Sequence, residues 1–527
     1  MAAISVTIKW GKEKLTATVK PDDTPTTLFA QLEQRTGVPV ARQKLMAKGA
    51  WRGVLKAEMS LAALKDGQNV TLMGTAETLV KPAVETKFLE DLAEDEAAAS
   101  GLVLPAGIAN LGNTCYMNST LQCLRAVPEL RAGLDRTTAG GGAAAGGPNE
   151  VPSALAATYA TLDASTSPVE PMRLVATLRT AFPQFAQRGR GGGYSQQDAE
   201  ELYSTLMSAL AGAMADEGAG GRGAGNVVDG LFGIDFEERL ACAETDAEPE
   251  IVKSDSARKL VCNIQGGMAG ANVDHLHEGL KLALVGSLDK RSEVLGRDAT
   301  WTKTQAIKRL PPYLCVQFMR FYWKATPDSA DHTGVKCKIM RPITFTPTMD
   351  VFPFLTGPLK AAVLANKKAH GAKVEAELFN KEAKAKAAKA AEAAAAEPAA
   401  APMETDDGPE AAAGDDDDAL AAAIAMSIEK PASPEATEGA AILKTSGMPD
   451  DFQGNYELFA IVTHKGRSAD GGHYMGWVKQ DGTKDKWLVF DDDLVSESTT
   501  EFVMGLKGGG DEHMSYLQFY RARTGAI

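Results

Sequence analysis

The chain of 527 residues is 44% hydrophobic, which suffices for two or more globular domains. Its formal net charge of −14 argues against nucleic-acid binding, which relies on basic patches, and simple solubility is the preferred explanation. The six cysteines form no C-x-x-C pair and no apolar run reaches the ~18 residues of a membrane span, so we expect a cytoplasmic and nuclear protein rather than a disulfide scaffold, a zinc ribbon or a membrane protein.

Residues 1–76 are predicted to form a small α+β domain. Apolar and polar residues alternate over 4–8 and again over 15–19, which is typical of two strands joined by a turn at Gly11. The remaining expected elements are a helix that opens at Thr24-Pro25 and ends at Gly37, and strands at 44–47 and 69–73.

This order of elements resembles ubiquitin, as does the run Ala41-Arg-Gln-Lys-Leu-Met-Ala-Lys-Gly49. The chain continues past Gly74 without a terminal Gly-Gly, so the resemblance implies a ubiquitin-like β-grasp domain that is not itself conjugated. Any other small β-grasp domain is the alternative.

Residues 77–104 are rich in Glu, Asp and Ala and are interpreted as a linker to a large domain at 105–523. Near the start of this domain, the stretch 107–124 is typical of a loop that ends abruptly in a helix. Asn113 and Thr114 are good N-cap residues, and apolar residues recur at helical spacing until Pro128. Cys115 is therefore expected at or next to the first residue of a half-buried helix, where unpaired N–H groups and the helix dipole favour the thiolate. Cys123 is expected to pack in the core.

The middle of the chain contains a second capped helix and a long insertion. After Tyr194 we expect Ser195 at the cap and Asp198 in the first turn. Residues 310–323 are predicted to form an apolar core strand. The composition from 357 to 450 indicates an insertion that is helical in part and otherwise disordered, with order returning at Tyr456.

A cysteine nucleophile needs a base, and the base needs an orienting group. Among seven histidines, His473 is the best candidate because it opens a strand directly after Gly471-Gly472. His464 flanks the same small-residue loop. For His513, a structural role is the alternative to a catalytic one. Taken by itself, His473 is equally well explained as a structural histidine whose hydrogen bonds are satisfied and as a catalytic base.

The hairpin that follows His473 supplies the orienting group. If its centre is Gly482, His473 lies directly opposite Asp491, with Cβ atoms roughly 5 Å apart on one face of the sheet. Asp492 then points to the other face, and Asp493 lies one step further along the first. A register shift of one residue would spoil the pairing.

Three ordered motifs resemble those of the ubiquitin-specific proteases. The run Asn110-Leu-Gly-Asn-Thr-Cys115-Tyr-Met-Asn resembles their cysteine box, and Tyr194-Ser-Gln-Gln-Asp-Ala-Glu their glutamine-rich motif. Gly472-His473-Tyr474, followed by Phe490-Asp491-Asp492, is similar to their histidine box. The resemblance implies a papain-like thumb, palm and fingers fold for 105–523. The ubiquitin-like domain joined directly to it resembles the proteasome-associated branch of the family.

The resemblance also implies the reaction, which is thiol-dependent hydrolysis of isopeptide bonds at the C-terminal glycine of ubiquitin, without a cofactor or metal. It implies ubiquitin, ubiquitin chains and the proteasome regulatory particle as partners of a chain that is monomeric when free. The implied roles are Cys115 as nucleophile, His473 as general base and then acid, Asp491 as orienting carboxylate, Asn110 as a donor to the oxyanion, and Gln197, Asp198 and Tyr474 as residues that hold the ubiquitin tail.

Two regulatory features are expected. In similar proteins the loop corresponding to 467–472 blocks the tail channel until the protein docks on the proteasome, so we expect low basal activity. Residues 415–429 resemble a ubiquitin-interacting motif, and a chance match within low-complexity sequence is the alternative. The residues on one helical face of this motif are Leu420, Ala423, Ile424 and Ser427.

Two other functions remain open on the sequence. One is a catalytically weak, ubiquitin-binding regulator of the proteasome, and the other is a cysteine hydrolase for a different ubiquitin-like modifier. The complete set of Cys115, His473, Asp491 and Asn110 favours an enzyme.

Overall fold

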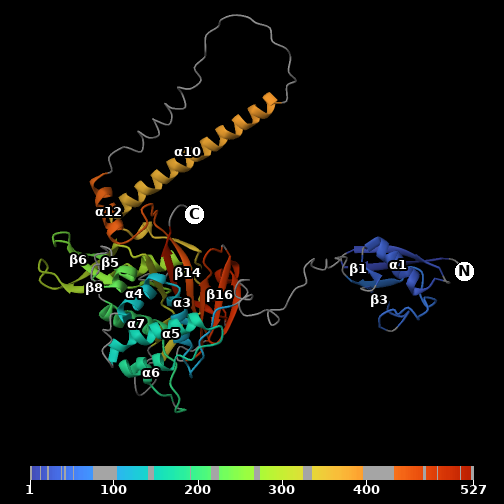
Figure 1. Cartoon of the computed structure of the whole chain (residues 1–527), viewed down its shortest axis with the longest axis horizontal. Coiled ribbons are helices and arrows are strands. Elements are labelled where there is room, and N and C mark those ends of the chain that lie inside the picture. Colours follow the sequence, from blue (N-terminus) through green and yellow to red (C-terminus); the bar gives the residue numbers. More distant parts are fainter. Residues whose placement is uncertain are drawn as a thin grey trace, which may run out of the picture. The chain divides into compact units, whose positions relative to one another are not determined.

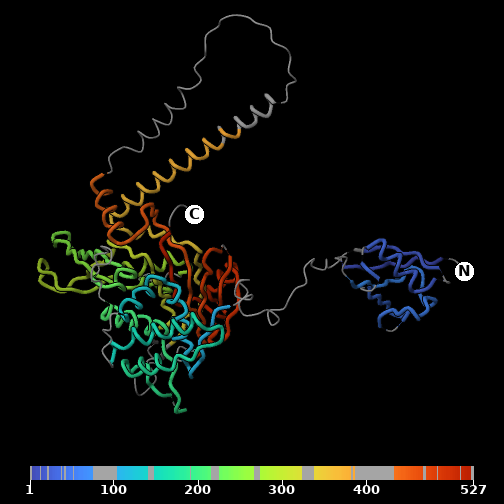
Figure 2. The backbone as a smooth tube through the Cα atoms, viewed as in Figure 1, coloured from blue at the N-terminus to red at the C-terminus, as the bar shows by residue number. Residues whose placement is uncertain are grey.

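The computed structural model consists of two units, Met1–Leu102 and Val103–Ile527, which are described separately. Figure 1 labels their helices and strands, and Figure 2 follows the same backbone. The structure describes residues 3–11, 13–20, 23–36, 38–40, 43–51, 53–74, 104–139, 147–189, 191–214, 225–265, 273–324, 335–395, 433–466, 471–483, 485–510 and 512–523. Within these ranges, no helix is long and apolar enough to cross a membrane.

The first unit is a four-stranded sheet in the order β2-β1-β4-β3 with one helix packed on it. Its elements are β1 (Ile4–Trp10), β2 (Glu13–Val19), α1 (Pro25–Thr36), β3 (Lys44–Met46) and β4 (Asn69–Met73). Strands β1 and β2 form the predicted hairpin, and Gly11 adopts φ +58° at its turn, where a glycine is favoured. Strand β4 runs parallel to β1. The hairpin, the helix and the two later strands follow one another as predicted, which confirms the α+β order.

The second unit begins with helices gathered around α3. These elements are α3 (Cys115–Arg125), α4 (Pro128–Ala139), η3 (Gly147–Glu150), α5 (Val151–Ala164), α6 (Met172–Ala181), η4 (Pro183–Ala186), α7 (Ala199–Ala213) and α8 (Val227–Phe232). Every residue from Cys115 to Leu124 is buried, so the prediction of a half-buried helix was wrong. Helix α3 packs against α7 on one side and against β15 of the main sheet on another, which encloses its polar residues as well.

The main sheet follows the order β17-β16-β15-β14-β18-β10-β7, and β13 pairs with β14. A separate sheet has the order β6-β5-β9-β8, and β11 and β12 form a third. The strands are β5 (Ile234–Cys242), β6 (Ile251–Ala257), β7 (Leu260–Cys262), β8 (Val285–Arg291), β9 (Asp298–Arg309), β10 (Tyr313–Phe318), β11 (Phe321–Lys324), β12 (Val335–Lys338), β13 (Thr348–Asp350), β14 (Asn455–Lys465), β15 (His473–Lys479), β16 (Lys486–Asp491), β17 (Leu494–Thr499) and β18 (Met514–Ala522). The remaining elements are α9 (Leu276–Ala283), η5 (Phe352–Phe354), α10 (Gly357–Ala395), α12 (Pro434–Thr445) and α13 (Thr500–Met504).

One predicted strand is divided, and the insertion at 357–450 is helical in part, as predicted. The apolar run at 310–323 is divided between β10 and β11, because Arg320 interrupts it and donates to four backbone carbonyls, those of Ser515, Ile339, Arg341 and Lys507. The predicted insertion contains α10, which projects from the rest of the second unit (Figure 1), and α12, which packs against it. The described chain resumes at Ser433, earlier than Tyr456.

Candidate active site

Helix α3 begins at Cys115, as predicted, and the loop before it is folded by its own side chains. The side-chain oxygen of Asn110 (Oδ1) accepts from the backbone N–H groups of Gly112 (2.9 Å) and Thr114 (3.2 Å). The Thr114 hydroxyl accepts from the Leu111 N–H (2.9 Å), so it stabilises the loop and makes no cap bond to the helix. This compact turn delivers Cys115 to the helix start, where its side chain is 3% exposed.

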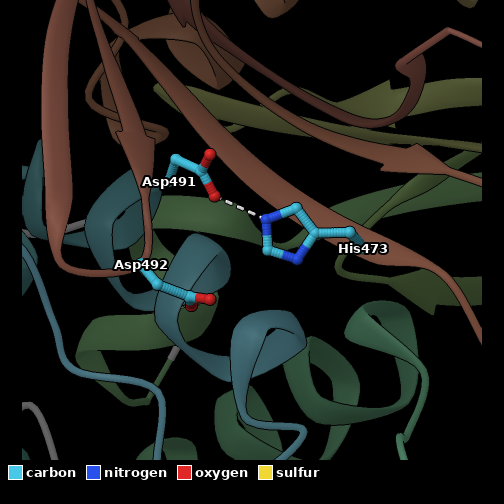
Figure 3. Close-up of side chains that lie close together, drawn as sticks. All are labelled: His473, Asp491 and Asp492. Atoms are coloured by element: carbon cyan, nitrogen blue, oxygen red, sulfur yellow. Dashed lines mark hydrogen bonds and ion pairs between the residues drawn. The ribbon is translucent and has the colours of Figure 1, made fainter.

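His473 opens β15, and its Nε2 lies 2.5 Å from Oδ1 of Asp491 at the end of β16 (Figure 3). The predicted register was nevertheless wrong. Gly476 pairs with Phe490 and the Gln480 N–H donates to the Lys486 carbonyl, so the hairpin is centred on Thr483 rather than Gly482. The residue directly opposite Asp491 is therefore two positions along β15 from His473, the residue predicted to lie there. A two-residue shift keeps both side chains on one face, and they meet diagonally.

His473 also interacts with Cys115. A hydrogen bond with Cys115 is the largest influence on this histidine, and together with Asp491 it outweighs burial and raises the pKa of His473 to about 9. Since Nε2 faces Asp491, Nδ1 is the ring nitrogen left for the sulfur. The arrangement therefore favours a protonated His473 beside Cys115 at neutral pH.

Asp492 has a role that the sequence did not indicate. It occupies the β16–β17 turn with φ +54°, and its carboxylate accepts from the side-chain amides of Asn110 (2.8 Å) and Asn118 (2.7 Å). Its backbone carbonyl accepts from the Ile108 N–H (2.8 Å). Asp492 thus ties the histidine hairpin to both the cysteine loop and α3.

The side chains of His473, Asp491 and Asp492 place ligand-type atoms within 4.8 Å of one another (Figure 3). Their hydrogen bonds explain this cluster without an ion, because Asp491 accepts from His473 and both oxygens of Asp492 accept from amides. We interpret it as a hydrogen-bonded network in which Asp491 orients the imidazole and Asp492 holds Asn110 and Asn118.

The glutamine-rich motif contributes a contact that the sequence analysis missed. The Nε2 of Gln196 lies 3.7 Å from the sulfur of Cys115. Gln197, which the sequence analysis selected, donates to the Ser195 carbonyl in its own loop (3.4 Å). The two adjacent glutamines therefore make different contacts. A helix that starts only at Ala199, after both glutamines, would have been the signal, because Gln196 then lies in the loop beside Cys115.

The predicted cap of α7 was also wrong. The helix begins at Ala199, and Asp198 rather than Ser195 caps it by accepting from the Glu200 N–H (2.9 Å). The Asp198 carboxylate accepts in addition from the Tyr516 hydroxyl (2.6 Å). Tyr474, the third predicted tail residue, is 2% exposed and lies between His464 and Tyr516, at ring-centroid distances of 4.6 and 6.2 Å.

Two further histidines lie near His473. His464 is fully buried, and burial lowers its pKa to about 3. The ring of His513 lies 6.0 Å from that of His473, its Nδ1 is 3.1 Å from the Thr463 hydroxyl, and burial lowers its pKa to about 4. Both therefore stay neutral where His473 is charged, which separates the candidate base from its neighbours.

Other sequence predictions concern residues away from this cluster. Cys123 is buried in the core, as predicted, and burial raises its pKa to about 12. The motif residues Leu420, Ala423, Ile424 and Ser427, and the loop 467–470, lie outside the described residues. A cavity of about 450 Å³ between α7 and strands β5, β6 and β9 is not lined by Cys115, His473 or Asp491, and its arginines pair with aspartates there.

The chain is similar to one protein family and to several individual proteins. Residues 106–520 match the family described as "Ubiquitin carboxyl-terminal hydrolase". The chain is 36% identical to "Ubiquitin carboxyl-terminal hydrolase 6" of Arabidopsis thaliana, over 98% of this chain and 99% of the relative. It is 32% identical to "Ubiquitin carboxyl-terminal hydrolase 6" of Schizosaccharomyces pombe, over 99% of each, and 28% identical to "Ubiquitin carboxyl-terminal hydrolase 14" of Caenorhabditis elegans, over 98% and 93%.

Proposed function

The chain belongs to the ubiquitin carboxyl-terminal hydrolase family of cysteine deubiquitinases, and we propose that Cys115, His473 and Asp491 carry its reaction. The observation that carries this proposal is the position of His473. Its Nε2 is held by Asp491 (2.5 Å) while the ring interacts with Cys115 at the start of α3. A nucleophile, a base and an orienting group are thus assembled from three elements.

The chemistry follows from this arrangement. The Cys115 thiolate attacks the carbonyl carbon of the terminal glycine of ubiquitin, and the His473 imidazolium gives its proton to the departing lysine amine. Neutral His473 then takes a proton from the water that attacks the thioester, and Cys115 leaves as the thiolate. Asp491 keeps the imidazole in the orientation that serves both proton transfers.

Asn110 is proposed to stabilise the oxyanion that forms in each attack. Its amide nitrogen carries two hydrogens, and the bond to Asp492 (2.8 Å) uses one of them. The two bonds from backbone N–H groups to its side-chain oxygen (Oδ1) fix the side chain next to the start of α3. Removal of one such donor typically lowers kcat by ~10²–10³-fold.

The ubiquitin tail is proposed to run along the residues just before α7. Asp198 and Gln197 lie there, and Gln196 on the same stretch contacts the nucleophile. A tail bound beside these residues would bring its terminal glycine to Cys115. Tyr474 supports the residues before α7 from within the core, because it packs against Tyr516, which donates a hydrogen bond to Asp198.

We further propose that the ubiquitin-like unit docks on the proteasome and that the enzyme trims ubiquitin there. The outer face of β3 and β4 exposes Lys44, Met46 (39%) and Met73 (51%), an apolar and basic surface suited to a protein partner. Low basal activity before docking, controlled by the loop at 467–472, and ubiquitin binding by 415–429 belong to the same proposal and rest on the family resemblance.

One experiment tests the catalytic assignment. The full chain is incubated with ubiquitin that carries a C-terminal electrophile, with and without purified proteasomes, and the adduct is followed by mass. One ubiquitin should attach to the wild type and to Cys337→Ala, which removes a half-exposed cysteine, but not to Cys115→Ala. Labelling of Cys115→Ala would refute the assignment. Equal rates with and without proteasomes would refute only the proposed autoinhibition.

A further inference from the structure

Lys338, at the end of β12, makes three hydrogen bonds to the end of β14. Its Nζ donates to Nδ1 of His464 (2.5 Å), to the backbone carbonyl of His464 (3.0 Å) and to that of Gly466 (2.8 Å). An ammonium has three hydrogens to donate, so these acceptors satisfy it completely. Lys338 therefore connects the end of β12 to the end of β14 and to Gly466, the residue that follows it.

The contact with Lys338 also decides the state of His464. A lysine ammonium can only donate, so Nδ1 of His464 accepts, and the ring is neutral with its hydrogen on Nε2. Burial favours the same neutral state and lowers the pKa of His464 to about 3. The ring is thus held in one orientation, with Nε2 on the side away from Lys338.

The Nε2 side of this ring faces the backbone that leads into β15. A Cβ added at Gly472 would lie 2.7 Å from Nε2 of His464 and 2.2 Å from the Lys465 carbonyl, and Gly472 has φ +123°. Gly472 therefore lies directly against the imidazole in a conformation that only glycine adopts readily. The next residue is His473.

On its other side, His464 contacts the catalytic strand through Tyr474, at a ring-centroid distance of 4.6 Å, and His464 pairs with Tyr474 across β14 and β15. The ring is therefore enclosed by the residues immediately before and after His473. Two successive glycines before His473 give the backbone freedom, and a fixed ring beneath Gly472 limits it.

We propose that Lys338 is a positioning residue for the hydrolytic reaction, and that it acts through His464 to hold Gly472 and hence the start of β15 where His473 meets Cys115 and Asp491. This inference rests on the proposed role of His473 as the base. Burial and the nearby Arg320 lower the pKa of Lys338, whereas its three uncharged acceptors favour the ammonium form that donates to them.

The test uses the full chain and ubiquitin with a C-terminal fluorogenic amide. Lys338→Met should lower kcat by about 10- to 100-fold, the range for misplacement of a catalytic group by about 1 Å, with KM within about twofold of wild type. The basic limb of the kcat/KM profile should move to lower pH, because a displaced His473 loses its contacts with Cys115 and Asp491. Lys253→Met, which changes an exposed lysine on β6, is the control and should match the wild type.

Variants of His464 show whether Lys338 acts through it. His464→Leu should reproduce the loss, and the double variant should be no slower than either single variant, since both remove one connection. His464→Asn keeps an acceptor near the position of Nδ1 and should retain more activity than His464→Leu. Urea titrations and near-UV circular dichroism give the folded fraction of each protein, to which rates are normalised.

Three results would overturn the inference. These are a normalised kcat of Lys338→Met within twofold of wild type, a basic limb that does not move, or losses that multiply in the double variant. Failure of the proposed function has a different signature, because His473→Ala would then retain activity whatever Lys338→Met does.

Discussion

His473 and Asp491 meet diagonally across the β15–β16 hairpin, with Nε2 and Oδ1 2.5 Å apart, while the strand register continues from Gly476 opposite Phe490. The diagonal matters because Asp491 is the last residue of its strand and Asp492 turns away at once. One carboxylate can therefore orient the imidazole while the next, on the same turn, holds the cysteine loop.

Asp491→Asn keeps the shape of the side chain but removes its charge, and an amide can present its N–H groups to Nε2 and favour the wrong tautomer. We expect kcat for the fluorogenic ubiquitin substrate to fall on the order of 10²-fold or more, as in serine hydrolase triads. KM should change little, because Asp491 faces the histidine. A kcat within twofold of wild type would show that the imidazole is oriented by other groups.

The raised pKa of His473 sets the pH range of activity. The competent pair is a thiolate with an imidazolium, and the imidazolium loses its proton as the pH rises through about 9. We therefore expect kcat/KM to stay high to about pH 8 and to fall through a limb near pH 9. The limb should be measured with substrate far below KM. A limb near 6.5, the ordinary value for histidine, would contradict the interaction with Cys115.

The raised pKa also links pH to stability, with a defined sign. Since the folded pKa lies above the unfolded value of about 6.5, folding favours the protonated form. The stabilisation is complete below about pH 6.5 and is lost as the pH rises to about 9. The difference in free energy of unfolding between wild type and His473→Gln should therefore shrink over this interval in urea titrations. A difference that grows with pH would reverse the argument.

Asp492→Ala removes the acceptor shared by Asn110 and Asn118. We expect a lower kcat, because the proposed oxyanion donor loses its support, and a loss of on the order of 1–3 kcal/mol in the free energy of unfolding. The two effects are measured by steady-state kinetics and urea titration. Asp493→Ala changes the exposed carboxylate beside it and is the matched control. Equal behaviour of the two variants would argue against the bridge.

The sequence was sufficient to predict what depends on local pattern. Cys115 opens its helix where the apolar spacing predicts, although Thr114 makes no cap bond there, and His473 and Asp491 share a face because a strand alternates strictly with period two. The sequence was insufficient where the length of a turn determines the register of two strands. The hairpin register depends on how many residues the turn between Gln480 and Lys486 takes up, and the turning point lies one residue from its most obvious glycine.

The role of Asp492 could not be predicted for a related reason. Strand alternation placed it on the face away from His473, but the strand ends at Asp491, and the left-handed conformation of Asp492 redirects its carboxylate to Asn110 and Asn118. These partners lie 382 and 374 residues away in the chain, so only the folded structure brings them together. Helix α12 lies in the insertion predicted to be helical in part, but its Ser433 cap and buried Leu443 show that order returns before Tyr456.

Gln196 and Gln197 offer the sharpest distinction between sequence and structure at this site. Gln196 lies 3.7 Å from the Cys115 sulfur, whereas Gln197 bonds within its own loop. We expect Gln196→Ala to lower kcat and the rate of Cys115 alkylation by iodoacetamide, because it removes a donor to the thiolate. Gln197→Ala, one residue along, should act on KM through the ubiquitin tail and leave alkylation unchanged. If Gln197→Ala slowed alkylation and Gln196→Ala did not, the loop before α7 would have to present Gln197 rather than Gln196 to the nucleophile.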